Sequence, residues 1–361
     1  MFAPNFCITG RIAKALMAIE ADRQIVAGLP LTVPMLDSLR RTARLLSTHY
    51  STRIEGNKLT AVQVAQVVAG EGNFPGRERD EAEVRHYFAA LEFVQRIGRK
   101  RVALSETDIR TIHGLVMSGT TKPTSYRDCQ NVIRDARSGQ TVYMPPEAHD
   151  VQKLMKQMVQ WVNTSLKTGE LPVPVVAALA HYQFATIHPY LDGNGRTARL
   201  LTTLILHRNG YGLNGIYSLE EYYAGNLEAY YAGLTVGPGH NYYFVRAEGD
   251  ITPFVKYFCV AMAEAFGNVR ARAAEAIRRG DPDQVTLLRD LSPRQRNVLG
   301  LFRTNRIVMA KDVAVFFKMR PRMASLLCAK WVKERFLVIE NPSTKERSYR
   351  LADEYEELVT R

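Results

Sequence analysis

The chain has 361 residues, of which 46% are hydrophobic and 23% are charged, and this composition excludes a disordered or low-complexity protein. No apolar run approaches the roughly 18 residues of a membrane-spanning helix, and the first residues lack the basic flank and apolar core of a signal peptide, so we expect a cytoplasmic protein without membrane contact. The net charge of +12 favours partners that carry phosphate groups, and the length predicts two or three domains.

Residues 1–100 are predicted to form an N-terminal helical region, in which the segment at about 35–55 is the clearest helix. Apolar residues return along one of its faces every three or four positions, Pro34 stands near its start and Gly56 follows its end. Glu55 lies in the last turn, where a carboxylate opposes the helix dipole at a cost of about 0.3–1 kcal/mol. It is either an exposed glutamate without a role or one held there for a function.

Residues 101–268 are expected to form a mainly α-helical core. Two more helices, at 59–70 and 79–98, precede it in the sequence. One interruption, at about 131–143, has a β-branched arm, a Ser-Gly turn and a second β-branched and aromatic arm that ends before two prolines. This pattern predicts a short hairpin beside the helices.

Residues 285–361 form the basic part of the chain, with 16 Lys and Arg against 9 Asp and Glu. A charged stretch at 269–284 precedes them and marks the expected domain boundary. Ser292 before Pro293 is a good helix cap, and two short helices, a basic helix and a hairpin predict a winged helix-turn-helix. Either DNA or a protein is then a candidate partner for the basic residues on or beside the third helix, which are Arg320, Arg322, Lys330, Lys333 and Arg335.

The four cysteines are far apart and form no Cys-x-x-Cys pair, so neither a zinc site nor a disulfide framework is predicted. We expect buried free thiols at these positions, which are Cys7, Cys129, Cys259 and Cys328.

The densest chemistry lies in the segment HPYLDGNGRTAR, residues 188–199. A glycine-rich loop before a helix can direct backbone amides and the helix dipole at one anion, which predicts a phosphate site at Gly193, Asn194 and Gly195. Arg196 and Arg199 stand three apart on the following helix, so both guanidiniums can reach further phosphates.

Two further residues of this segment have reactive side chains. Asp192 beside a polyphosphate is a natural ligand for Mg²⁺, and His188 can take a proton from an attacking hydroxyl near neutral pH. Metal-assisted hydrolysis with these two residues as ligands is a weaker alternative, because no further His or carboxylate follows at ligand spacing.

This segment resembles the Fic motif of protein AMPylators, which is HPF, any residue, Asp or Glu, GNGR, two residues and Arg. It departs from that motif in having Tyr190 at the Phe position. The likeness extends over roughly residues 30–265 and includes the hairpin, which is similar to the flap of the family. The resemblance implies a Fic-type helical core that transfers AMP from ATP to a Ser, Thr or Tyr hydroxyl of a target protein, or of the chain itself, and releases pyrophosphate.

The resemblance also implies roles for the motif residues. His188 would be the general base and Asp192 would hold Mg²⁺. The backbone from Gly193 to Arg196 would bind the α- and β-phosphates, and Arg199 would hold the γ-phosphate. The flap would hold the target by strand addition.

Two tyrosines of a downstream Tyr-rich segment that also looks Fic-like, Tyr230 and Tyr231, are candidates for contact with adenine, although aromatic residues at this spacing are more often part of a core.

Ser51, Glu55 and Gly56 match the inhibitory motif of many Fic proteins, which is Ser or Thr, three residues, Glu, and Gly or Asn. The resemblance implies an N-terminal inhibitory helix whose Glu55 pairs with Arg199 and so takes the cation that the γ-phosphate needs. In the family the same glutamate can position a water for removing AMP, and that activity stays open here, as does a homodimer.

Two other functions also remain open. The chain could be a DNA-binding regulator whose Fic-like part only senses nucleotide, or an enzyme that transfers UMP, a phosphate or phosphocholine. The intact DGNGR sequence favours AMP, because relatives that transfer a phosphate usually alter this loop.

Overall fold

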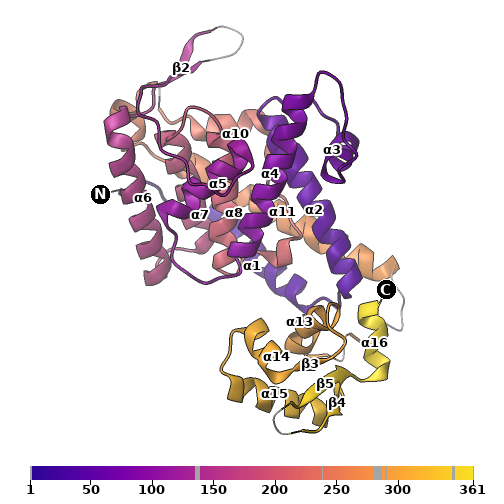
Figure 1. Cartoon of the computed structure of the whole chain (residues 1–361). Coiled ribbons are helices and arrows are strands. Elements are labelled where there is room, and N and C mark those ends of the chain that lie inside the picture. Colours follow the sequence, from indigo (N-terminus) through magenta and orange to yellow (C-terminus); the bar gives the residue numbers. More distant parts are fainter. Residues whose placement is uncertain are drawn as a thin grey trace. The chain divides into compact units, whose positions relative to one another are not determined.

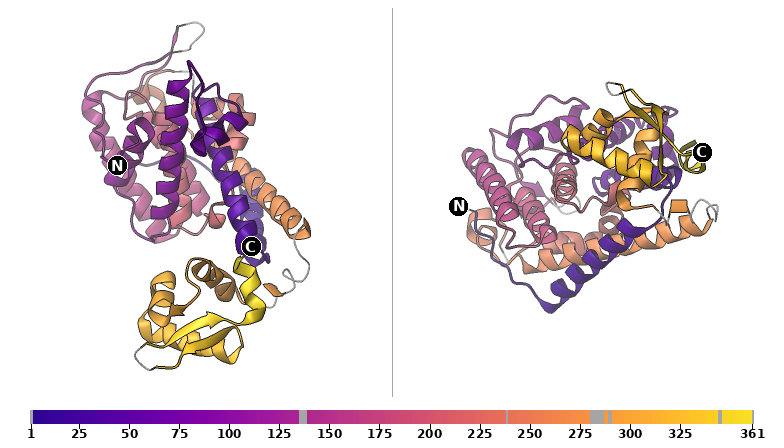
Figure 2. Two further views of the ribbon diagram at one scale, coloured as in Figure 1. Left: turned by 45° about the vertical axis from the view of Figure 1, so that its right-hand side comes forward. Right: turned by 90° about the horizontal axis from the view of Figure 1, so that it is seen from below.

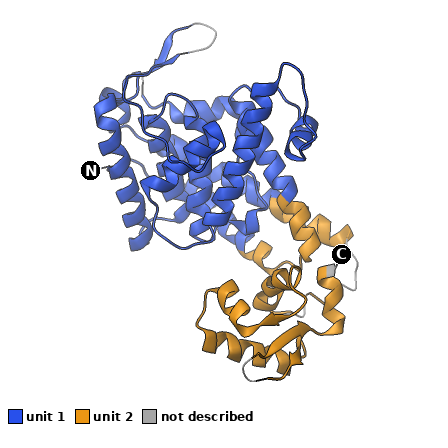
Figure 3. Cartoon of the chain, viewed as in Figure 1, with its two compact units in different colours: residues 1–23, 41–268 blue, residues 24–40, 269–361 orange. Residues whose placement is uncertain are grey.

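The computed structural model describes residues 2–134, 139–237, 239–279, 287–288, 291–343 and 346–360. Over these residues the chain is mainly α-helical, as expected, with two small antiparallel sheets (Figure 1). It divides into two compact units, residues 1–23 with 41–268 and residues 24–40 with 269–361 (Figure 3). Residues 135–138 of the expected flap and residues 280–286 at the expected boundary lie outside the described residues.

The first unit contains the helices that surround the Fic-like segment. Three helices contribute residues to both units, namely α1 (Gly10–Gly28), α2 (Val33–Ile54) and α11 (Thr252–Arg279). The others belong to the first unit and are α3 (Ala61–Val68), α4 (Glu78–Ile97), α5 (Glu106–Ser118), α6 (Ala148–Thr168), α7 (Val173–Ile187), α8 (Asn194–Arg208), α9 (Glu220–Gly225) and α10 (Leu227–Leu234). Two short irregular helices complete it, η1 (Leu213–Gly215) and η2 (Tyr242–Arg246).

Helix α7 forms the centre of this unit. It is apolar on every side, and Val175, Leu179 and Phe184 are fully buried, as expected for a helix that other helices surround. Helices α6 and α8 pack against it, and α4 and α5 pack against α8 (Figure 1). The loop between α7 and α8, which carries the Fic-like segment, is therefore held by the rigid core.

The expected hairpin is present as β1 (Ile133–Arg134) and β2 (Thr141–Tyr143), which pair antiparallel. It projects from the helices of the first unit in two views (Figures 1 and 2). The buried hydroxyl of Tyr143 donates to the carbonyl of Thr186 at 2.6 Å, which ties the base of the hairpin to the end of α7.

The second unit has its own hydrophobic core around Trp331 and Phe336, to which Val33 at the start of α2 also belongs. As predicted, Ser292 caps a helix that begins at Pro293, and Gln295 completes a capping box. The unit contains α13 (Pro293–Phe302), β3 (Val308–Met309), α14 (Ala310–Phe317), α15 (Pro321–Lys333), β4 (Leu337–Asn341), β5 (Ser348–Leu351) and α16 (Asp353–Thr360). The strands form one antiparallel sheet in the order β3-β5-β4.

The four cysteines are free, but only two are buried. Cys259 and Cys328 lie in cores, whereas Cys7 and Cys129 are exposed, so the expectation of buried thiols was wrong for those two. Both lie in irregular segments, which give no periodic pattern from which burial could be predicted. None of the helices in the described part of the chain is long and apolar enough to span a bilayer.

Candidate active site

His188 occupies the turn at which α7 ends. Its backbone has a φ of 52°, a left-handed conformation that is costly for a residue with a side chain. Its carbonyl accepts a hydrogen bond from Nε of Arg127 at 3.0 Å, and the carbonyl of Pro189 accepts one from the backbone N–H of Arg127 at 2.9 Å. Arg127, which the sequence analysis did not single out, therefore holds this turn in place.

The His188 ring is neutral at pH 7, because burial lowers its pKa to about 4. Its Nδ1 lies 3.3 Å from the carbonyl of Ala185. A carbonyl only accepts, so Nδ1 carries the hydrogen and the lone pair is on Nε2. The ring is therefore in the tautomer that a general base requires.

The loop before α8 has the form of an anion cradle. Gly193 has a φ of 76°, and a Cβ on it would lie 2.7 Å from Sδ of Met117. A Cβ on Gly195 would lie 2.3 Å from Oε1 of Glu55. The side chain of Asn194 bonds the backbone of Tyr190 twice, at 3.0 and 2.8 Å, which closes the loop. A side chain at Gly193 or Gly195 would thus collide with Met117 or Glu55, so the loop requires glycine at both positions.

Asp192 stands at the edge of this cradle with 55% of its side chain exposed. Its Oδ1 accepts from the backbone N–H of Gly193 at 2.6 Å and from Nη2 of Arg196 at 3.2 Å. Among the described residues, Oδ2 has no hydrogen-bonding partner. His113 bonds the carbonyl of Asp192 at 2.9 Å and stacks on the Tyr190 ring with centroids 3.5 Å apart. These contacts fix the loop and the Asp192 carboxylate, and they leave Oδ2 without a hydrogen-bonding partner among the described residues.

Arg199 contacts the end of α2, 144 residues earlier in the chain. Its Nε donates to Oγ of Ser51 at 2.8 Å, and its Nη2 donates to the carbonyl of Ser51 at 2.9 Å and to Oε1 of Glu55 at 2.8 Å. Burial lowers the pKa of the guanidinium, but the Glu55 carboxylate and nearby tyrosines outweigh burial, and the pKa is raised overall. Gly56, with a φ of 96°, turns the chain away immediately after this contact.

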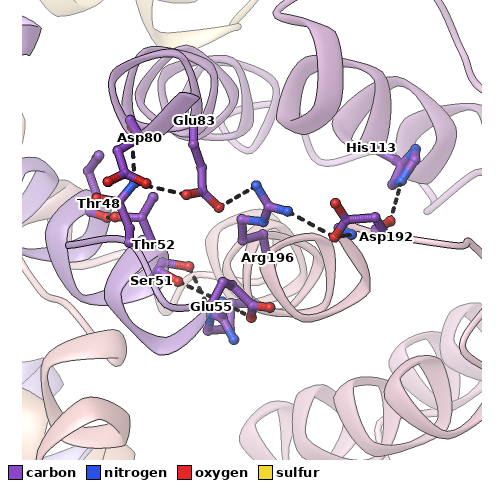
Figure 4. A network of polar contacts seen from close by, with 12 residues as sticks. Thr48, Ser51, Thr52, Glu55, Asp80, Glu83, His113, Asp192 and Arg196 are labelled. Carbon is purple, nitrogen blue, oxygen red and sulfur yellow. Dashed lines mark hydrogen bonds and ion pairs between the residues drawn. The ribbon is translucent and has the colours of Figure 1, made fainter. Parts of the chain in front are cut away.

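Arg196 contacts α4. Its Nη1 lies 2.6 Å from Oε1 of Glu83, and Figure 4 shows Glu83 and Asp192 on opposite sides of its guanidinium. Burial raises the pKa of Glu83, while Arg196 and Asn57 lower it, and the net shift is upward. Glu83 was not singled out in the sequence, because one glutamate in an amphipathic helix carries no local signal.

The two tyrosines suggested for adenine differ in exposure. Tyr230 is 2% exposed and its hydroxyl bonds Nε2 of His181 at 2.9 Å, so it is part of the core. Tyr231 is 49% exposed and lies close enough to Glu55 and Arg199 for their charges to shift its pKa. The prediction of an adenine contact therefore fits Tyr231 better than Tyr230.

These features define a mainly helical protein in which a glycine-rich loop, flanked by His188 and Asp192, joins α7 to α8. Residues 103–206 match the model of the Fic/DOC family.

Similar proteins agree with this assignment. The chain is 26% identical over 250 residues to a protein from Drosophila grimshawi named protein adenylyltransferase Fic, and 27% identical over 248 residues to one of the same name from Drosophila willistoni. Each match covers 68% of this chain but only 46% and 45% of those relatives, respectively.

Solved structures extend the likeness. A Fic family protein from Desulfovibrio desulfuricans is 25% identical, with a TM-score of 0.60 over 98% of this chain and 99% of that one. Fic-1 from C. elegans, residues 134–508, is 27% identical, with a TM-score of 0.58 over 74% of this chain and 73% of that one.

Proposed function

We propose that this chain transfers AMP from ATP to a hydroxyl group of a protein, either a separate target or the chain itself, and releases pyrophosphate. The observation that carries the proposal is the neutral His188, with its Nε2 lone pair, at one end of an anion cradle. The relatives named protein adenylyltransferase support the same reaction.

In this reaction the cradle and the first turn of α8 bind the phosphates through backbone amides. Nε2 of His188 accepts the proton of the hydroxyl while its oxygen bonds to the α-phosphorus. The bond from the α-phosphorus to the oxygen bridging the β-phosphate then breaks, and pyrophosphate leaves. Such transfers depend mainly on positioning and charge stabilisation, which the rigid α7–α8 loop is suited to supply.

Asp192 fits a magnesium ion, because its Oδ2 is available at the edge of the cradle and Mg²⁺ favours one or two carboxylates together with phosphate oxygens. No group of three or more His, Cys, Asp or Glu side chains suited to a metal occurs in the described ranges. When bound, the ion would neutralise charge on the phosphates, and Asp192 would orient it.

Glu55 is proposed to inhibit the reaction. Its carboxylate contacts Arg199, which the resemblance assigns to the γ-phosphate, and would also repel that phosphate. ATP bound in this state would have its phosphates out of line for attack.

The test is to incubate the purified Glu55→Gly protein, which lacks the proposed inhibitory carboxylate, with Mg²⁺ and ATP, and separately with UTP and with CDP-choline, and to measure intact mass. An added mass of about 329 Da would identify AMP as the covalent modification. Modification from another nucleotide but not from ATP would refute the AMP assignment.

The second unit favours a second function, contact with nucleic acid through α15, because the five basic residues predicted for this role are all exposed. Binding of duplex DNA that weakens steeply with salt would support it. An absence of binding at low salt would refute it.

A further inference from the structure

Glu83 belongs to no motif of the sequence, yet it contacts the second arginine of the Fic-like segment. Its Oε1 lies 2.6 Å from Nη1 of Arg196, with 17% of the Glu83 side chain and 8% of the Arg196 side chain exposed. Removing one partner of an ion pair that is so little exposed to water is strongly destabilising, because the other charge is left buried and uncompensated.

Arg196 in turn contacts the carboxylate proposed to hold magnesium. One guanidinium nitrogen bonds Glu83 and another bonds Oδ1 of Asp192, while Nε is buried without a partner among the described residues. Because Gly193 also donates to Oδ1, that oxygen already accepts two hydrogen bonds, whereas Oδ2 accepts none among the described residues. Arg196 thereby selects which carboxylate oxygen is available.

Glu83 is itself fixed by the segment that follows the inhibitory helix. Nδ2 of Asn57 donates to Oε2 of Glu83 at 2.8 Å and to the carbonyl of Asp80 at 3.0 Å, and Oδ1 of Asn57 accepts from the backbone of Leu59 at 3.1 Å. Asn57 is 7% exposed. A continuous set of contacts thus runs from Asn57 through Glu83 and Arg196 to Asp192, and most of it is drawn in Figure 4.

We propose that Glu83 is a positioning residue of this site: it holds the Arg196 guanidinium so that Arg196 fixes Oδ1 of Asp192 and leaves Oδ2 for a divalent cation. The inference rests on the proposed function, because it concerns the metal bound with the nucleotide. It assigns the Arg196 side chain to the metal ligand rather than directly to a phosphate.

The test compares ATP affinity with and without Mg²⁺, measured by calorimetry in a Glu55→Gly/His188→Ala background that binds nucleotide without turnover. The dissociation constant of ATP without Mg²⁺, divided by that with Mg²⁺, measures the coupling between metal and nucleotide. Partners behind a metal ligand typically contribute 10- to 100-fold to metal affinity, so we expect Glu83→Gln to reduce this ratio by about tenfold and to leave metal-free ATP affinity unchanged.

A matched control is Glu92→Gln on the same helix, α4. Glu92 forms an ion pair with Arg44 at 2.8 Å with 48% of its side chain exposed, and its loss should leave the ratio unchanged. Glu83→Asp keeps the charge on a shorter side chain and should give an intermediate ratio, which also serves if the glutamine variant does not fold.

A double variant shows whether Glu83 acts through Arg196. Glu83→Gln added to Arg196→Gln should reduce the ratio no further than Arg196→Gln alone. Additive losses, an unchanged ratio for Glu83→Gln, or tighter metal-free ATP binding would each overturn the proposal. A Glu55→Gly protein that binds ATP but transfers no AMP would refute the proposed function instead, and the calorimetric ratio would still decide the role of Glu83.

Discussion

Replacing Glu55 with glycine removes the carboxylate that contacts Arg199 at 2.8 Å. The Arg199 side chain is 1% exposed and also donates twice to Ser51, so it should stay in place when Glu55 is lost. In the proposed reaction, its Nη2 would then bind the γ-phosphate. We expect the variant to incorporate AMP faster than the wild-type protein.

The size of the effect follows from the contact that is lost. A hydrogen bond to a charged group contributes about 1.5–3 kcal/mol, and the 27% exposure of the Glu55 side chain places this one near the lower end, because solvent screens it. At about 1.4 kcal/mol for each factor of ten, incorporation at subsaturating ATP should rise about tenfold.

The assay follows radiolabel from α-labelled ATP into protein over a range of ATP concentrations. Arg53→Gly is the matched control, because it puts a glycine at the same helix end in place of an exposed side chain. Glu55→Gln removes the charge but keeps an acceptor, so its AMP incorporation should fall between that of the wild type and that of Glu55→Gly. Equal incorporation by wild type and Glu55→Gly, or an equal rise in Arg53→Gly, would refute the inhibitory role.

Three other perturbations test separate parts of the site and fold. His188→Ala in the Glu55→Gly background should lower AMP transfer by about 10²- to 10⁴-fold, with ATP affinity by calorimetry unchanged, because the ring acts on the proton and not on the phosphates; retained transfer would remove His188 from the mechanism. Gly195→Ala in that background should weaken ATP binding, because its Cβ would still lie 3.2 Å from Nη1 of Arg199 and fill the cradle, and undiminished affinity would place the phosphates elsewhere. Burial lowers the pKa of His181 to about 3 from its ordinary 6.5, so only the unfolded state takes up this proton as pH falls below 6.5. His181 should therefore reduce the free energy of unfolding by up to about 1.4 kcal/mol for each unit by which the pH falls. In urea unfolding, this free energy should depend less on pH in His181→Gln than in the wild type, and an equal dependence in the two proteins would contradict this.

Local patterns predicted the parts of the site that are continuous in sequence. Pro34 lies in the first turn of the helix observed at Val33–Ile54 and Gly56 follows its end, and Gly193 precedes the start of α8. The contact between Glu55 and Arg199 could be predicted only from the resemblance to a family, because no periodicity joins residues 144 positions apart.

The residues that support the site were missed for a physical reason. Arg127, His113 and Glu83 act through tertiary contacts with backbone carbonyls or with another side chain. Each is a common residue type in a loop or a helix, so its neighbours in sequence do not distinguish it from a solvated one. Tyr230, whose sequence context suggested an adenine contact, is 2% exposed, and its adenine contact stays a prediction.

Glu55 and Asn57 stand two residues apart and act on different arginines of the same helix, the first directly on Arg199 and the second through Glu83 on Arg196. With both proposed roles, this turn inhibits the site through Glu55 and supports it through Asn57. A signal that detached the whole segment would free Arg199 and also withdraw the amide that steadies Glu83. Effective activation is then restricted to a small rotation of the Glu55 side chain, with the rest of the turn left in place.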